Sequence, residues 1–169
     1  PTHTIADAVA IGEDLDGPAL ASLLTSHRSG LQALVAPMEP SAADTITTPL
    51  VSRILDILRE DFDYVVVDTP PALDDDVLAA FDHSNVVALL ATLDIPALKN
   101  LKLTLETLDL IGFSRDRLKI VLNRSDSKVG LSLSEVEKTL RAPIVAQIPS
   151  SRDVPASTNR GVAIVSDDP

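Results

Sequence analysis

The stretch FDYVVVDTPP, residues 62–71, decides how the chain can fold. Its middle, Tyr64 to Val67, is a run of aromatic and β-branched residues, which favours an extended strand. The run ends on Asp68, and the prolines that follow lack the amide hydrogen that a sheet needs. An uninterrupted apolar run with such a stop predicts a strand buried on both faces, as in a parallel sheet.

Similar runs recur on either side of this stretch. We expect further strands at residues 31–36 (LQALVA), 85–91 (NVVALLA), 118–123 (LKIVLN) and 144–148 (IVAQI), with a short last edge at 163–165 (AIV). Apolar residues at helical spacing fill the gaps between them. The expected helices are 49–60, 74–83, 96–111, 132–140 and 152–159, preceded by two short helices within residues 4–26 that are divided at 12–17. Strands that alternate with helices indicate an α/β domain with a mostly parallel sheet and helices on both faces.

The composition fits such a domain and argues against several other classes. The 169 residues suffice for one domain with a real core, and aromatic residues make up only 2% of them, so the core is aliphatic. A net charge of -11 leaves no basic footprint for nucleic acid, so we expect no nucleic-acid binding by this portion. The absence of cysteine excludes disulfides and is compatible with a cytoplasmic protein.

Polar residues follow the expected strands, at the edge where ligands bind in open parallel sheets. An apolar strand that ends on an acid, as at Asp68, is typical of a carboxylate that holds Mg²⁺ on nucleotide phosphates. The alternative is that Asp68 only forms a turn. The amide of Asn123 matches the donor and acceptor pattern of adenine, but it could equally close a turn with its own backbone.

Three other features have simpler explanations. The acidic run at residues 74–76 could bind a metal, but it favours the start of a helix, where negative charge is stabilising. His3, His27 and His83 are far apart and have no ligand-like spacing. The leucine stripe along residues 96–111 indicates a core face, with a partner surface as the alternative.

In order and wording, these segments resemble the MinD/ParA family of deviant-Walker P-loop ATPases, and within it the CpaE/TadZ branch of pilus assembly and polar localisation. The likeness extends from about Leu31 to Val165. It is carried by GLQALVAP (30–37), FDYVVVDTPP (62–71), VLNR (121–124), GLSLSEVEKTL (130–140) and IPSSRDVPASTNRGVAIV (148–165). The resemblance implies a Rossmann-like P-loop fold, ATP and Mg²⁺ as ligands, and an ATP-dependent homodimer.

The resemblance also implies roles for individual residues. Asp68 matches the Walker-B acid, a catalytic residue that holds Mg²⁺ through water. Thr69 and Pro70 belong to the switch segment that senses the γ-phosphate. On the adenine side, Asn123 would face the base, Arg124 would lie beside it, and Pro149 would line the pocket.

One part of the family pattern is absent from the sequence. The loop K-G-G-x-G-K-[ST], whose amides and lysine hold the phosphates, does not occur. We therefore expect residues 1–169 to be the C-terminal two-thirds of a single ATPase domain that lacks its N-terminal strand or strands. Strands that lose their neighbours leave buried backbone groups unpaired. We expect the 169 residues alone to fold poorly, rearrange or pair with another chain, and to be inactive as an ATPase.

The leading hypothesis is an ATP-hydrolysing switch protein in pilus assembly, secretion or polar localisation. Its partners would belong to that machinery, and it would be cytoplasmic or peripheral at the inner membrane or cell pole. The alternatives are a non-catalytic localisation scaffold of the same fold, a septum-site or partitioning regulator, and a different α/β nucleotide-binding protein with no switch role.

Overall fold

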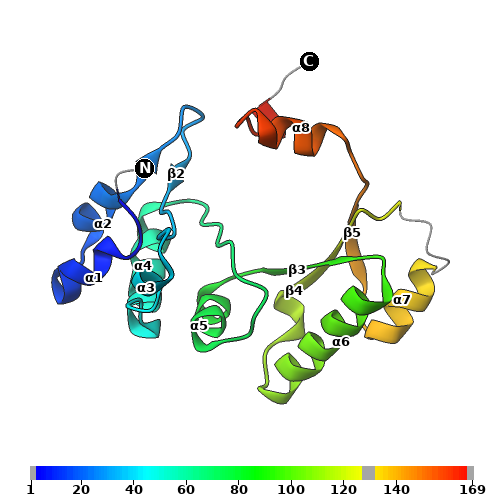
Figure 1. Ribbon diagram of the computed structural model, residues 1–169. Coiled ribbons are helices and arrows are strands. Elements are labelled where there is room, and N and C mark those ends of the chain that lie inside the picture. The colour runs from blue at the N-terminus through cyan, green and yellow to red at the C-terminus, as the bar shows by residue number, and fades with distance from the viewer. Residues whose placement is uncertain (1–2, 127–131, 167–169) are drawn as a thin grey trace. The chain divides into compact units, whose positions relative to one another are not determined.

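The computed structural model describes residues 3–126 and 132–166 (Figure 1). The chain forms two compact units, residues 1–84 and 85–169. The predicted α/β class is confirmed, because helices alternate with the strands of a parallel sheet in the second unit. No helix within the described ranges has both the length and the apolar character that crossing a membrane requires.

The first unit is built mainly from helices. Its elements are α1 (Asp7–Ile11), η1 (Gly12–Asp14), α2 (Gly17–Leu23), β1 (Thr25–Ser26), β2 (Gln32–Ala33), α3 (Pro40–Ala43), α4 (Thr48–Asp61) and α5 (Asp75–His83). The two short helices predicted at the front are confirmed as α1 and α2. The side chain of Asp16 caps α2 by accepting a hydrogen bond from the Ala19 amide at 2.8 Å.

The core of the first unit lies between α1, α2 and α4. Its buried members are Ala8, Leu15, Leu20, Leu23 and Ile54. The guanidinium of Arg53 on α4 donates to the Leu15 carbonyl at 2.9 Å and ties this long helix to the loop before α2. The predicted helix 49–60 is thereby confirmed as α4, with its apolar side on this core.

Residues 31–36 do not form the parallel strand predicted for them. Only Gln32–Ala33 are in a strand, and they pair antiparallel with Thr25–Ser26. The two strands are joined by a tight turn in which Gly30 has a φ of 89°. A connection this short permits an antiparallel pair only, because parallel neighbours need a long crossover.

The second unit holds a three-stranded parallel sheet in the order β3-β4-β5. Its elements are β3 (Val87–Thr92), α6 (Ile95–Leu110), η2 (Arg115–Arg117), β4 (Leu118–Asn123), α7 (Leu133–Leu140), β5 (Ile144–Ile148), α8 (Asp153–Asn159) and η3 (Ile164–Ser166). The strands predicted at 118–123 and 144–148 have the predicted bounds. The last edge strand predicted at 163–165 is wrong, since η3 makes a single helical turn there and packs on α8.

Helices α6 and α7 cover one face of this sheet (Figure 1). The buried residues of the shared core are Ala91, Leu93, Leu101, Leu105, Ile120, Leu122, Val136 and Leu140. Most of the leucine stripe on α6 is therefore core, as favoured above. The helix predicted at 132–140 is present as α7, and it begins with a capping box in which Ser132 and Glu135 each bond the other's backbone amide.

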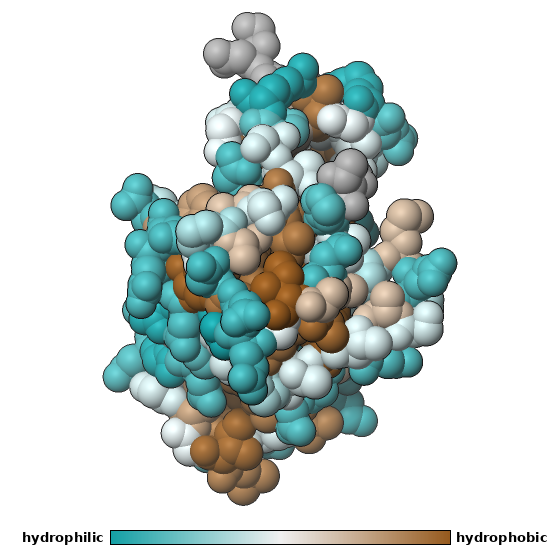
Figure 2. Space-filling view, turned by 90° about the vertical axis from the view of Figure 1, so that its left-hand side faces the viewer, coloured by the Kyte–Doolittle hydropathy of each residue, from teal (hydrophilic) through white to brown (hydrophobic). Residues whose placement is uncertain are grey.

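Large apolar side chains are nevertheless exposed in both units. Met38 is 98% exposed, Val66 93% and Leu110 88%. Figure 2 shows apolar surface between hydrophilic side chains on the face that it draws. Exposed apolar area of this kind is typical of surfaces that contact another segment or another molecule.

Candidate functional site

The Asp68 segment lies in the first unit, between α4 and α5. Residues 64–68 form no strand, contrary to the prediction, and Tyr64 and Val66 are 91% and 93% exposed. No strand among the described residues pairs with this segment, so its backbone lacks the ladder of hydrogen bonds that a strand requires. The apolar run therefore remains unpaired and largely in solvent.

The predicted metal and switch residues lie at the end of this segment. Asp68 and Pro70 are exposed, and Thr69 is half-buried. Within the described residues, no hydrogen bond or ion pair engages the Asp68 carboxylate, so its lone pairs are available. An exposed carboxylate with free oxygens is a chemically suitable ligand for Mg²⁺, directly or through water.

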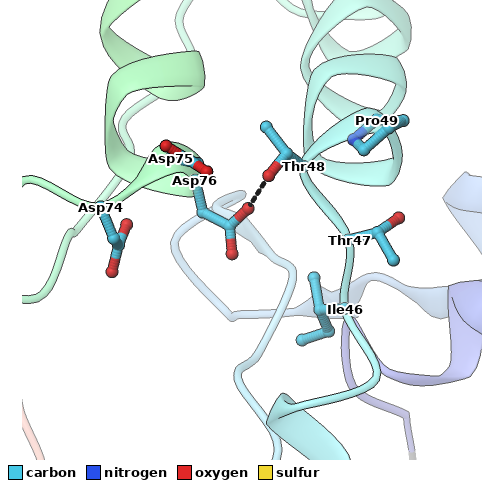
Figure 3. A pocket seen from close by; sticks show the side chains of 7 residues that line it. All are labelled: Ile46, Thr47, Thr48, Pro49, Asp74, Asp75 and Asp76. Carbon is cyan, nitrogen blue, oxygen red and sulfur yellow. Dashed lines mark hydrogen bonds between the residues drawn. The ribbon is translucent and has the colours of Figure 1, made fainter.

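The acidic run at the start of α5 has a structural role. Asp74 is the N-cap of α5 and accepts a hydrogen bond from the Val77 amide at 2.9 Å. Asp76 accepts a hydrogen bond from the Thr48 hydroxyl at 2.6 Å, which links α5 to α4 (Figure 3). The three carboxylates in Figure 3 do not converge on one point, and no metal-binding cluster occurs within residues 3–126 and 132–166. The simpler explanation of this run is supported.

In the second unit, the residues that follow the strands gather at the carboxyl edge of the sheet. After β3, Asp94 caps α6, accepting hydrogen bonds from the Ala97 amide at 2.9 Å and from the Thr92 hydroxyl. The Thr92 hydroxyl and then the Ala97 amide lower the pKa of Asp94. Asp94 therefore caps α6, two residues beyond the end of β3.

Asn123 is the last residue of β4, and Arg124 follows it. The side-chain oxygen of Asn123 accepts a hydrogen bond from the Arg124 amide at 3.0 Å, which is the turn-closing interaction considered above. Since an amide N–H can only donate, this contact fixes the oxygen toward the backbone and turns the NH₂ group away from it. Arg124 has a φ of 52°, in the left-handed region that non-glycine residues rarely adopt. The chain thus changes direction sharply after Asn123.

Pro149 follows β5, the neighbour of β4. The β4–β5 ladder pairs Asn123 with Ile148, and beyond it the Ser125 amide donates to the Ile148 carbonyl at 3.0 Å. The Ser150 amide donates to Oδ1 of Asp126 at 2.7 Å. The structure thus brings Asn123, Arg124 and Pro149 together on two adjacent strand ends, whereas Asp68, Thr69 and Pro70 belong to the other unit.

Asp126 is a residue to which the sequence patterns assign no role. It follows a strand end, as many polar residues do, and nothing in its spacing singles it out. Its contact with Ser150 depends on the left-handed turn at Arg124, which residue type does not reveal.

Comparison with known proteins shows which proteins the chain resembles in sequence and in fold. No protein-family model matches the chain. The septum site-determining protein MinD of Thermotoga maritima is 24% identical over 147 residues, which cover 83% of this chain and 54% of that protein. MinD of Helicobacter pylori is 21% identical over 160 residues, covering 87% and 59%. The chain thus spans roughly half to three-fifths of the length of these curated relatives.

Among solved structures, a ParA family ATPase from Chlorobium tepidum matches with a TM-score of 0.88 at 21% identity, over 95% of this chain and 67% of that one. The chain has the fold of the ParA and MinD ATPases. The cell division ATPase MinD of Pyrococcus furiosus matches with a TM-score of 0.79 at 19% identity, over 100% of this chain and 69% of that one. MinD of Pyrococcus horikoshii, solved with Mg-ADP, gives 0.70 at 16% identity, over 98% of this chain and 72% of that one. The sequence relatives and the structures together support the MinD/ParA-type P-loop ATPase resemblance.

Proposed function

We propose that this chain belongs to an ATP-binding and ATP-hydrolysing switch protein of the MinD/ParA type. The observation that carries the proposal is the match to the ParA family ATPase fold over 95% of the chain at a TM-score of 0.88. Support comes from polar residues at the strand ends of the sheet, the edge at which open α/β sheets bind ligands. The identity is low, so the chemistry rests on the residues at those positions.

The residues proposed to bind the nucleotide fall into two groups, an acid side in the first unit and a base side in the second. On the acid side, Asp68 holds Mg²⁺ through water and acts as the catalytic Walker-B carboxylate, with Thr69 and Pro70 forming the switch segment. On the base side, Asn123 offers its NH₂ group to an acceptor on the adenine ring, with Arg124 and Pro149 lining the pocket. Mg²⁺ would offset charge on the phosphate oxygens.

The phosphate cradle is not among these residues. The sequence contains no Gly-Lys pair, so the loop whose amides and lysine hold the phosphates in the family pattern does not occur in it. We propose that residues 1–169 form the C-terminal two-thirds of one ATPase domain, and that a preceding segment supplies the P-loop. Strands from that segment would pair with residues 64–68 and with the edge of β3 that has no partner among the described residues.

Two cellular roles fit this activity. The wording of the sequence favours the CpaE/TadZ branch, in which an ATP-dependent homodimer would act with pilus or secretion machinery at the inner membrane or cell pole. The curated relatives are MinD proteins, which favours a septum-site regulator as the second candidate. Retention of the protein by a pilus assembly complex, or by a division-site complex, would separate the two.

ATP binding and turnover by the full-length protein test the proposal. We expect saturable Mg²⁺-ATP binding, and turnover that falls by at least about a hundredfold in Asp68→Ala, because a carboxylate that holds the metal stabilises the transition state. Asp63→Ala is the matched control, since Asp63 is an exposed acid at the start of the same segment.

Binding without turnover in the unaltered protein would favour the non-catalytic scaffold. Equal turnover by the Asp68→Ala and Asp63→Ala variants would remove Asp68 from the site. Absence of any ATP binding by the unaltered protein would contradict the proposal.

A further inference from the structure

The hydrogen-bond ladder between β4 and β5 continues beyond both strands. It passes from the pair Asn123 and Ile148 to the bond from the Ser125 amide to the Ile148 carbonyl. In a parallel ladder the bonds are evenly spaced and alternate in direction. The next bond would therefore run from the Ser150 amide to the Ser125 carbonyl.

That position is filled by a side chain instead of the backbone. The Ser150 amide donates to Oδ1 of Asp126 at 2.7 Å. The left-handed conformation of Arg124, with φ at 52°, redirects the chain just before this point. The carboxylate of Asp126 thus takes the place of the backbone carbonyl as the acceptor and extends the ladder by one bond.

The charge on Asp126 suits this task. A carboxylate that accepts from an amide forms a shorter and stronger bond than a neutral carbonyl does. The Ser150 hydroxyl and the Ser150 amide lower the pKa of Asp126 below its ordinary value, as expected for a carboxylate that accepts hydrogen bonds. The contact joins the loop after β4 to the loop after β5, 24 residues further along the chain.

We propose that Asp126 is a positioning residue for the base side of the nucleotide site. By holding Ser150, it fixes the adjoining Pro149 relative to Asn123 and Arg124, the residues proposed to surround the adenine. This inference rests on the proposed function, because it assigns Asp126 a role in the same site. Asp126 itself need not touch the nucleotide.

The test uses the full-length protein and two ligands, Mg²⁺-ATP and Mg²⁺-tripolyphosphate, which lacks a base. We expect Asp126→Ala to weaken ATP binding about fivefold and to leave tripolyphosphate binding unchanged, since only the base side loses its support. Asp126→Asn keeps an acceptor oxygen for the Ser150 amide, so it should restore most of the ATP affinity. Asp116→Ala is the matched control, because Asp116 is an acid of η2, outside the strand-end loops.

Unchanged ATP affinity in Asp126→Ala would overturn the inference and leave the proposed function intact. An equal loss of affinity for ATP and for tripolyphosphate would also overturn the inference, because the effect would then not be confined to the base side. So would an Asp126→Asn variant that binds ATP as weakly as Asp126→Ala, because the asparagine keeps an acceptor oxygen for the Ser150 amide. If the unaltered protein binds tripolyphosphate but not ATP, or binds neither, the proposed function itself fails and the positioning role fails with it.

Discussion

Two stretches of the chain have similar sequences and different structures. Residues 64–68 (YVVVD) and residues 118–123 (LKIVLN) are both apolar runs that end on a polar residue. The second is β4, the middle strand of the sheet, in which Leu122 is fully buried. The first forms no strand, and its Val66 is 93% exposed.

The two stretches differ in whether neighbouring strands pair with them, and not in their residue types. β4 pairs with β3 on one side and β5 on the other, so its backbone groups are satisfied and its side chains meet α6 and α7. Residues 64–68 have no such neighbour among the described residues. A β-branched run therefore indicates a segment suited to a sheet, and the pairing decides whether a strand forms.

The largest expected effect comes from removing a core side chain from β4. We expect Leu122→Ala to lower the free energy of unfolding by about 2–5 kcal/mol, because it deletes a fully buried side chain and leaves a cavity. In the 169-residue chain, to the degree that it folds alone, the matched change Val66→Ala should alter the free energy of unfolding by less than about 0.5 kcal/mol, because the side chain is in solvent. Urea unfolding of both variants measures the two values. Similar losses at the two positions would show that residues 64–68 are packed after all.

Replacing Val66 by a charged residue tests whether residues 64–68 are paired in the full-length protein and unpaired in the 169-residue chain. In the 169-residue chain, Val66→Asp should be close to neutral, because the side chain is already in solvent. In the full-length protein we expect it to cost about 2–4 kcal/mol, because a preceding strand would bury the position. Denaturant unfolding of both lengths checks this, with Asp63→Asn as a surface control. A neutral effect in both would contradict the proposed pairing.

A smaller effect on the free energy of unfolding is expected from a substitution at the start of α7, one of the helices that cover the sheet. Ser132→Ala removes the side chain that begins the capping box of α7, and we expect a loss of about 1 kcal/mol. Ser22→Ala serves as the control, because the Ser22 hydroxyl bonds only the Ala19 carbonyl within α2. Thermal unfolding measures both, and an equal, negligible shift would show that the cap contributes nothing to the second unit.

The smallest expected effect is the dependence of the second unit on pH. The carboxyls of Asp94, Asp109, Asp126 and Glu135 have lowered pKa values, each chiefly because of a hydrogen bond from Thr92, Arg115, Ser150 and Ser132 respectively. A lowered folded-state pKa adds stability above the ordinary values of 3.8 and 4.5, and that stability is lost as the pH falls through the folded-state values. We expect a modest drop in melting temperature between about pH 6 and about pH 3 that high salt diminishes. A melting temperature that rises on acidification would contradict these pKa directions.

Much of the second unit was predictable because its patterns are local. β4 and β5 were predicted with their bounds, and the helix predicted at 132–140 is present as α7. Apolar alternation and caps depend on residues close in sequence, so the sequence reveals them. The prediction failed at residues 31–36, 64–68 and 163–165, where the outcome depends on which neighbouring strand is available.

The candidate site was predictable only in outline. Strand ends identify Asn123 and Pro149, and the structure places Asn123 at the end of β4 and Pro149 directly after the adjacent strand β5. The Asp126 contact was not predictable, because it arises from the left-handed turn at Arg124. The functional roles of all these residues stay predictions, on the acid side (Asp68, Thr69 and Pro70) and on the base side (Asn123, Arg124 and Pro149).

Amide hydrogen exchange along residues 64–68 of the full-length protein tests most directly whether this segment is a strand of an ATPase domain. Paired amides in a central strand exchange slowly, at rates governed by larger unfolding events. We predict protection at residues 64–68 comparable with that at residues 118–123, and little protection at 64–68 in the 169-residue chain. Rapid exchange at residues 64–68 in the full-length protein would contradict the proposed domain and, with it, the placement of Asp68 at the mouth of a sheet.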